Sequence, residues 1–174
     1  LVDLPESRQG ELDIFPCDLK WVHFERGEFA DAIVSEALAM LAKKRLSPLA
    51  VADITILSDS RKNGREIVKK LHQKGIRAIH TFAEDSRLER KKKMGFFMGD
   101  ARVKVTTLHS FKGWETRSLL VCIGIARSKQ EKALVYTGLT RLKRHQEGSM
   151  LTVVSKEEEL KAYGKTYPIY RELN

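Results

Sequence analysis

Polar residues crowd the end of a short strand-forming run in the middle of the chain. Val103–Thr106 is followed directly by Thr107–Glu115 (TLHSFKGWE), which we call the strand-end run. This break predicts a parallel strand that delivers hydroxyl, imidazole, ammonium and carboxylate groups at its carboxyl end, where open α/β sheets bind ligands. Hydroxyls, imidazoles and backbone N–H groups are common donors to nucleic-acid phosphates, and a carboxylate suits a ribose hydroxyl. Their density indicates a binding site.

Single members of this run have ordinary explanations as well. His109 is compatible with a satisfied loop histidine, Lys112 with a solvated charge, and Gly113 with a plain turn. The functional interpretation therefore depends on the cluster and not on any one residue.

A second run, Val135–Lys143 (VYTGLTRLK), places an arginine on a helical pattern; we call it the arginine run. Ala133–Leu139 is apolar almost all round, which predicts a buried helix. Arg141 shares the Leu134/Gly138 face, and Gly138, which costs about 1 kcal/mol against alanine in mid-helix, indicates close approach of another backbone. Arg141 either pairs with an internal carboxylate, which helix geometry alone favours, or directs its guanidinium at a phosphate supplied by another domain.

Strand and helix patterns alternate along the whole chain, which predicts one α/β domain over residues 1–174, with a mostly parallel sheet and helices on both faces. We expect strands at 21–24, 53–57, 76–80, 103–107, 119–123 and 150–154. Helices are expected at about 28–44, at 61–74 before the stop signal Gly75, in segment 86–93 behind a Ser86/Glu89 capping box, and after the capping boxes Ser128/Glu131 and Ser155/Glu158.

No phosphate-binding P-loop is present in the sequence. Gly164-Lys165-Thr166 is similar to the end of one, but the pattern requires a glycine where Glu159 stands. It must also join a strand to a helix, whereas this tripeptide follows a helical pattern and precedes Pro168. We expect that the chain cannot hold a triphosphate with its own loop.

The charge balance favours a polyanionic partner. The chain of 174 residues has a formal net charge of +9, which promotes association with nucleic acid without specifying a fold. Arg90, Lys91 and Lys92 belong to a basic segment that precedes Val103 closely. We expect them to add sequence-independent contacts to nucleic-acid phosphates; the alternative is a solvated face.

Cysteine content and the lengths of the apolar runs indicate the cellular compartment. Cys17 and Cys122 are too few for a disulfide framework, and we expect buried thiols in a reducing, cytoplasmic compartment. No apolar run approaches the roughly 18 residues of a membrane span, so no membrane partner is expected. The sequence begins at Leu1 without methionine, and we expect it to be part of a longer protein.

The two runs together resemble motifs V and VI of UvrD/Rep-type superfamily 1 helicases. The strand-end run matches a Thr-x-His-x-x-Lys-Gly-x-Glu pattern and the arginine run a Tyr-x-x-x-Thr-Arg pattern, with the order, the separation and the strand and helix contexts of the family. The resemblance covers nearly the whole chain. It implies the second RecA-like motor domain, a P-loop-NTPase fold lacking its own P-loop, with ATP and Mg²⁺ bound mainly by an N-terminal P-loop motor domain of the same protein.

The resemblance also implies roles for individual residues. Thr107, His109 and Lys112 would contact single-stranded DNA, and Arg141 would be the arginine finger on the γ-phosphate. The implied ATP-binding residues are Gly113, Glu115, Thr140 and Arg141. No metal ligand is expected in this chain.

The chain departs from the family at three places. Ser58-Asp59 stands where members commonly carry Tyr-Arg, and Trp114 stands where they often carry leucine. The short interval before Val103 leaves no room for the large inserted subdomain of the best-known members.

Two functions are compatible with these observations. The first is the C-terminal motor domain of an ATP-dependent DNA helicase acting on single-stranded or partly duplex DNA. The isolated domain would be inactive, because phosphoryl transfer also requires the phosphate cradle and the metal. The alternative is a degenerate RecA-like module that binds nucleic acid or protein without turnover.

Overall fold

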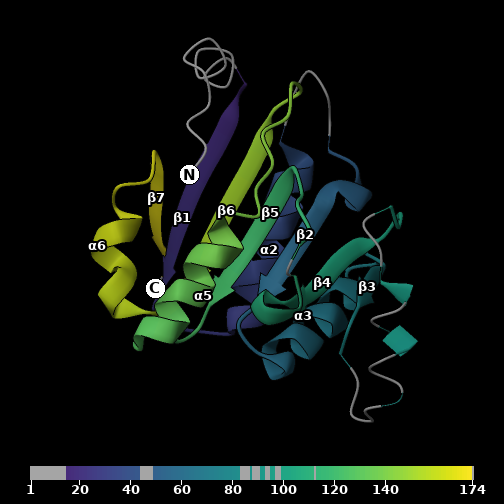
Figure 1. The fold of residues 1–174 in the computed structure, drawn as a ribbon, viewed down its shortest axis with the longest axis horizontal. Coiled ribbons are helices and arrows are strands. Elements are labelled where there is room, and N and C mark those ends of the chain that lie inside the picture. Colours follow the sequence, from purple (N-terminus) through teal and green to yellow (C-terminus); the bar gives the residue numbers. More distant parts are fainter. Residues whose placement is uncertain are drawn as a thin grey trace.

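The computed structural model describes residues 15–43, 49–82, 87, 91–92, 95–96, 99–111 and 113–173. Its centre is a seven-stranded sheet in the order β3-β4-β2-β5-β6-β1-β7, in which every described pairing is parallel (Figure 1). The strands are β1 (Cys17–Phe24), β2 (Ile54–Ser58), β3 (Ala78–His80), β4 (Val103–Thr107), β5 (Ser118–Ile123), β6 (Ser149–Ser155) and β7 (Ile169–Leu173).

Helices cover both faces of this sheet. They are α2 (Phe29–Ala42), α3 (Arg61–Gln73), α5 (Lys129–Leu139) and α6 (Lys161–Gly164), with single 3₁₀ turns η1 (Val51–Asp53), η2 (Leu108–Phe111) and η3 (Glu158–Leu160). The helices α2 and α3 pack on one face and α5 and α6 on the other (Figure 1). The predicted α/β class, with a parallel sheet and helices on both faces, is confirmed.

Alternation along the strands creates the two cores. Successive side chains of a strand point to opposite faces of the sheet. In β2, Ile54 and Ile56 join the core beneath α2 and α3, whereas Leu57 joins the core beneath α5. Both cores exclude water at these positions. The sheet from which the strand-end run emerges is therefore rigidly held.

Capping fixes where α5 begins. The Ser128 hydroxyl accepts a hydrogen bond from the Glu131 N–H at 3.2 Å, and the Glu131 carboxylate accepts one from the Ser128 N–H at 2.8 Å. This is the predicted capping box, worth about 1 kcal/mol in typical helices. Hydrogen bonds from Ser128 also hold the pKa of Glu131 below its usual range.

The end of the chain differs from the prediction. A helix follows β6 as predicted, but α6 has only four residues and is not terminal, because the edge strand β7 follows it. The expected Ser155/Glu158 box is also wrong, because Glu157 caps η3 instead. The buried Glu157 carboxylate also accepts a hydrogen bond from the Ala126 N–H at 2.9 Å, which ties the segment before α5 to the end of β6.

Cys17 and Cys122 are not joined in a disulfide. Cys122 is buried in β5 as predicted, and burial raises its pKa, whereas Cys17 is only half-buried. No helix in the described ranges is long and apolar enough to cross a membrane. The predicted Ser86/Glu89 capping box lies outside the described residues.

Candidate functional site

A groove of about 660 Å³ opens at the carboxyl ends of β2, β3 and β4. We call it the strand-end groove. Thr107, His109 and Trp114 of the strand-end run contribute to its wall. The other lining residues are Asp59, Ser60, Arg61, Thr81, Phe96 and Ser110.

The turn η2 presents the polar side chains of the strand-end run. Leu108 and Phe111 are buried in the core beneath α5 and anchor the turn. The Thr107 hydroxyl donates to the Ser110 hydroxyl at 3.0 Å and accepts from the Ser110 N–H at 3.3 Å. His109 is left exposed at the groove. Lys112, a predicted DNA contact, lies outside the described residues.

Asp59 gives the groove a carboxylate. Its oxygens accept hydrogen bonds from the Asn63 side-chain amide at 2.9 and 3.2 Å. Gly124 makes room for it, because a Cβ there would lie 2.1 Å from an Asp59 oxygen. The adjacent Ser58 is buried and donates its hydroxyl to the Ser60 carbonyl at 2.8 Å. Asp59 thus places an anion in the groove wall, which also contains Arg61.

Sequence reasoning did not assign the groove residues outside the strand-end run. Asp59, Ser60 and Arg61 follow β2, and Thr81 follows β3. The same rule that singled out the end of β4 applies to these strand ends. Applied to every strand, it would have found most of the groove.

The arginine run does not lie wholly on a helix, contrary to prediction. The helix α5 ends at Leu139, Thr140 is its C-cap, and Arg141 follows. Arg141 is half-buried, and its Nε donates to the Thr137 carbonyl at 3.0 Å. Within the described part of the chain no carboxylate forms an ion pair with it. The alternative of an internal carboxylate partner therefore loses its support.

The helix α5 is less buried than its composition predicted. Among Ala133–Leu139, only Val135 and Gly138 are buried, and Tyr136 is 68% exposed. The reason is position: α5 is an outer layer that covers β5 and β6 with one face (Figure 1). Its other face presents apolar surface to solvent.

The two runs touch each other through Gly138. A Cβ at Gly138 would lie 2.3 Å from Cδ2 of Leu108, so only glycine admits the leucine in its present position. The predicted close approach is real, but a side chain makes it and not a backbone. The contact joins η2 in the strand-end run to α5 in the arginine run.

A backbone bridge connects the same two runs beyond their polar residues. The Thr116 N–H donates to the Arg141 carbonyl at 3.0 Å, and the Lys143 N–H donates to the Thr116 carbonyl at 2.8 Å. Glu115 precedes this bridge and is exposed, as are Gly113 and Thr140. We call the segments around Glu115 and Arg141 the bridged edge.

The basic segment is described only in part. Lys91 is exposed, and Arg90 lies outside the described residues. The Lys92 ammonium donates to the Phe82 carbonyl at 2.9 Å and lies 3.4 Å from Nε2 of His80. Burial first, and then the positive charge of Lys92, lowers the pKa of His80 to about 4. The contacts of Lys92 place it next to Thr81 at the groove.

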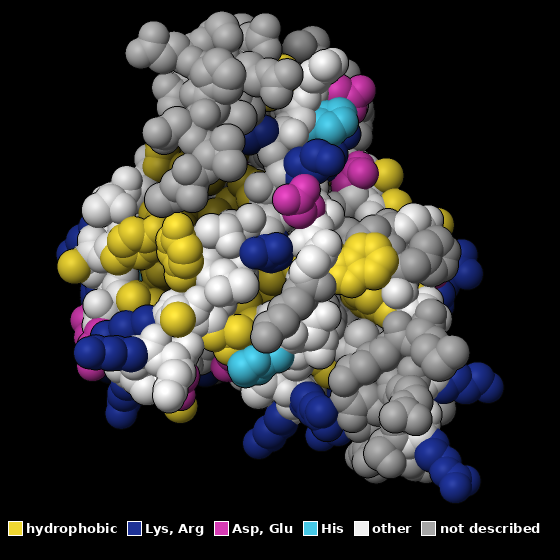
Figure 2. All heavy atoms as spheres, viewed as in Figure 1, with side chains coloured by type: hydrophobic (Ala, Val, Ile, Leu, Met, Phe, Trp, Pro, Cys, Tyr) yellow, Lys and Arg dark blue, Asp and Glu magenta, His cyan; other side chains and the backbone are white. Residues whose placement is uncertain are grey.

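Positive side chains project along the margin where the strands end. Figure 2 shows Lys and Arg spread over the lower margin of the view, which is the margin toward which the strands of Figure 1 run. This distribution suits an anionic ligand at that margin. Among the described residues no group of three or more His, Cys, Asp or Glu could hold a metal ion.

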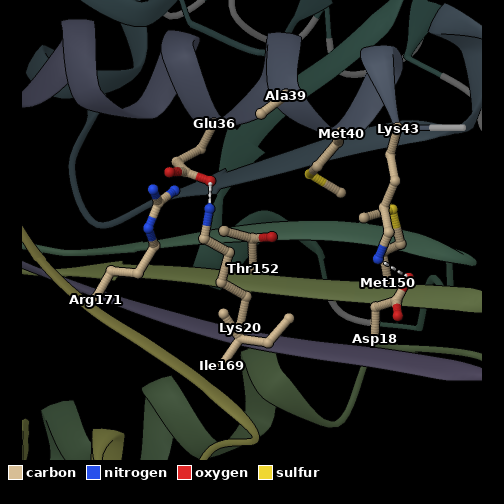
Figure 3. A pocket seen from close by; sticks show the side chains of 10 residues that line it. All are labelled: Asp18, Lys20, Glu36, Ala39, Met40, Lys43, Met150, Thr152, Ile169 and Arg171. Atoms are coloured by element: carbon tan, nitrogen blue, oxygen red, sulfur yellow. Dashed lines mark hydrogen bonds and ion pairs between the residues drawn. The ribbon is translucent and has the colours of Figure 1, made fainter.

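A second cavity, of about 220 Å³, lies between α2 and strands β1, β6 and β7 (Figure 3). We call it the α2 cavity. It contains ion pairs between Lys20 and Glu36 and between Lys43 and Asp18, and Figure 3 shows Arg171 pointing toward Glu36. Its charges largely neutralise one another, so it is a weaker candidate than the groove.

Comparison with known proteins adds evidence on the fold. No protein-family model matches the chain, and no curated protein sequence matches it. A solved structure of the C-terminal domain of a possible DNA helicase from Lactobacillus plantarum WCFS1 is similar, with a TM-score of 0.54 and 16% identity over 91% of this chain and 84% of that one. Domain 2 of the DEAD-box helicase Mss116p, solved bound to an RNA duplex, has a TM-score of 0.58 and 14% identity over 90% of this chain and 64% of that one.

Identities this low show the fold alone. The β-strand order, the two covered faces and both structural relatives agree on one architecture. The chain therefore has the fold of the C-terminal RecA-like domain of helicases.

Proposed function

We propose that this chain is the C-terminal motor domain of an ATP-dependent DNA helicase of the UvrD/Rep type. The observation that carries the proposal is the contact between the two runs. Leu108 packs on Gly138, and Thr116 bridges to Arg141. A motor domain needs a strand-binding surface and a nucleotide-facing surface in mechanical contact, and these contacts join two such surfaces.

The strand-end groove suits a single strand of nucleic acid. Its wall offers hydroxyls, an exposed imidazole and two aromatic rings, from residues including Thr107, His109 and Trp114. Hydroxyls and imidazoles donate to phosphate oxygens without reading the sequence, and aromatic rings accept stacked bases. The substrate in this proposal is single-stranded or partly duplex DNA.

The bridged edge suits a nucleotide held mainly by another domain. Arg141 uses Nε for the Thr137 carbonyl, which fixes the side chain and leaves its terminal nitrogens for an anion. A planar guanidinium is a strong partner for a phosphate. Glu115 is exposed beside it and would meet the ribose, with Gly113 and Thr140 nearby. ATP and Mg²⁺ would be held by an N-terminal P-loop domain, which supplies the phosphate cradle.

The test uses the longer protein that contains both motor domains. Arg141→Ala should lower the DNA-stimulated ATPase rate by roughly 10³-fold or more, the usual effect of removing an arginine finger. Arg144→Ala is the matched control, because this exposed arginine lies three residues away and contacts only the Phe15 carbonyl among described residues. DNA binding without nucleotide should be unchanged in both variants.

A binding module without turnover is the second candidate, and Asp59 is the observation that favours it. A carboxylate in the groove opposes the phosphates that a translocating motor must pass along. An ATPase rate that is unaffected by Arg141→Ala, in a protein that still binds DNA and ATP, would establish this alternative.

A further inference from the structure

Trp114 projects at the strand-end groove in a way that suits a nucleobase. We propose that the groove binds a strand with one base stacked on the indole of Trp114, so that binding depends on bases as well as on phosphates. This inference rests on the proposed function and assigns a subsite within it. It concerns a residue at which this chain departs from the helicases it resembles.

Trp114 is not a core residue. It is 38% exposed and belongs to neither hydrophobic core. Among the described rings none contacts it. An aromatic ring that is partly open to solvent offers a flat apolar face on which another ring can stack. The indole therefore has stacking surface to offer that packing does not consume.

The backbone holds this indole in place at the groove. Phe111 is buried and ends η2, and the Trp114 N–H donates back to the Phe111 carbonyl at 3.4 Å. Gly113 has φ +81°, a left-handed conformation that favours glycine and turns the chain between them. A residue held by such a turn loses little further freedom on binding a base.

The other tryptophan, Trp21, differs from Trp114 in its burial and its ring contacts. Trp21 is fully buried in β1, and its ring meets the edges of Tyr163 and Tyr167 at centroid distances of 5.7 and 5.2 Å. The chain contains two tryptophans in all. One completes a core, and the other lines the groove.

Charge in the groove also favours bases near Trp114. Asp59 repels a phosphate placed beside it, whereas Arg61, a cation of the same wall, attracts one. The Asn63 amide and the Ser58 hydroxyl donate hydrogen bonds to the Asp59 carboxylate. The hydroxyls of Thr107 and Ser110 provide donors for the backbone elsewhere on the wall. A strand that turns its bases toward the aromatic and acidic part of the groove avoids this repulsion.

Tryptophan fluorescence tests the proposal directly. Titration of the 174-residue chain with a 12-residue oligothymidine should quench the emission of Trp114, while the buried Trp21 contributes a constant background. An abasic deoxyribose-phosphate 12-mer should bind roughly 5- to 100-fold more weakly, the usual cost of losing a stacked base, and should not quench. A Trp21→Phe variant removes the background and should give the same result.

Substitutions at Trp114 complete the test. Trp114→Phe should keep most of the preference for oligothymidine over the abasic strand, and Trp114→Leu should abolish it, with circular dichroism and thermal unfolding unchanged in both. If Trp114→Leu keeps the preference, the stacking subsite is overturned; the proposed function then still stands if His109→Ala weakens binding. If neither strand binds wild-type protein at low salt, the proposed function fails as well.

Discussion

The strand-end groove and the α2 cavity are both polar, but they satisfy their charges differently. In the cavity, Lys20 meets Glu36 and Lys43 meets Asp18, so cation and anion cancel inside the protein. In the groove, Asp59 is bonded by the Asn63 amide, and His109 is exposed. Charges that cancel internally contribute to stability and attract no ligand. The groove instead combines Asp59 and Arg61 with hydroxyls and an imidazole that face an open space large enough for a ligand.

This comparison predicts that a cavity variant changes stability and leaves binding alone. Lys20→Met removes the ion-pair partner of the largely buried Glu36 carboxylate and leaves Arg171 as the nearby cation, so the free energy of unfolding should fall by about 1.5–3 kcal/mol, the contribution of a hydrogen bond to a charged group. Lys43→Met is the control, because its pair with Asp18 is well exposed and should cost less than about 1 kcal/mol. Urea denaturation measures the free energy of unfolding of both variants. Under conditions in which they are fully folded, their affinity for oligothymidine should match that of the wild type.

A substitution in the groove should instead change binding and leave stability unchanged. His109→Ala removes a donor that we expect to meet a phosphate, and hydrogen bonds to charged groups contribute about 1.5–3 kcal/mol. Affinity for oligothymidine should fall roughly tenfold, with no change in the urea midpoint because the ring is exposed. His145→Ala is the matched control, because this exposed histidine precedes the amino end of β6, whereas the groove lies at the carboxyl ends of the strands. Equal losses from the two variants would contradict a site at the groove.

A smaller effect should come from the basic segment beside the groove. Replacing Arg90, Lys91 and Lys92 with alanine should flatten the slope of log K against log salt by up to about 0.7 for each phosphate contact removed. A control triple variant at Lys161, Lys165 and Arg171 changes the same charge near the far edge strand β7. Its slope should stay as in wild type; identical shifts would show that only net charge matters.

A pH dependence of stability should come from His80 at the end of β3. Its pKa in the folded protein is lowered to about 4 by burial and by the nearby Lys92 and His72, whereas an unfolded histidine titrates near 6.5. The unfolded chain therefore binds more protons between these values, and this contribution to stability is full above pH 6.5 and is lost as pH falls toward 4. In His80→Gln the unfolding free energy should decline less over that window than in wild type.

Sequence patterns identified the fold where alternation and caps were strong. Strand β4, the Ser128/Glu131 capping box and the buried Cys122 strand all match their predictions. Strand β7 was missed because Ile169–Leu173 is an edge strand with mostly exposed side chains, so it lacks a buried face that would produce alternation. The end of α5 was missed because segment 140–144 contains no glycine or proline that would signal the end of a helix.

Only part of the candidate site could be predicted from the sequence. The strand-end run gathers its polar residues within one stretch, and sequence can show such density. Asp59 and Thr81 reach the same groove from separate strands, and only the strand order β3-β4-β2 brings them together. The roles of Glu115, Thr140 and Arg141 toward a nucleotide remain predictions, because they concern a second domain.

The packing of a Leu108 methyl group against Gly138 has a consequence for the coupling of α5 to the strand-end groove. A ligand that pushes α5 by a fraction of an ångström must carry Leu108 with it, because a packed core transmits displacement and does not absorb it. Thermodynamic reciprocity then applies: if nucleotide at Arg141 changes strand affinity by some factor, the strand changes nucleotide affinity by the same factor. The absence of a Cβ at Gly138 would thus determine how strongly binding at Arg141 and binding at the strand-end groove are coupled.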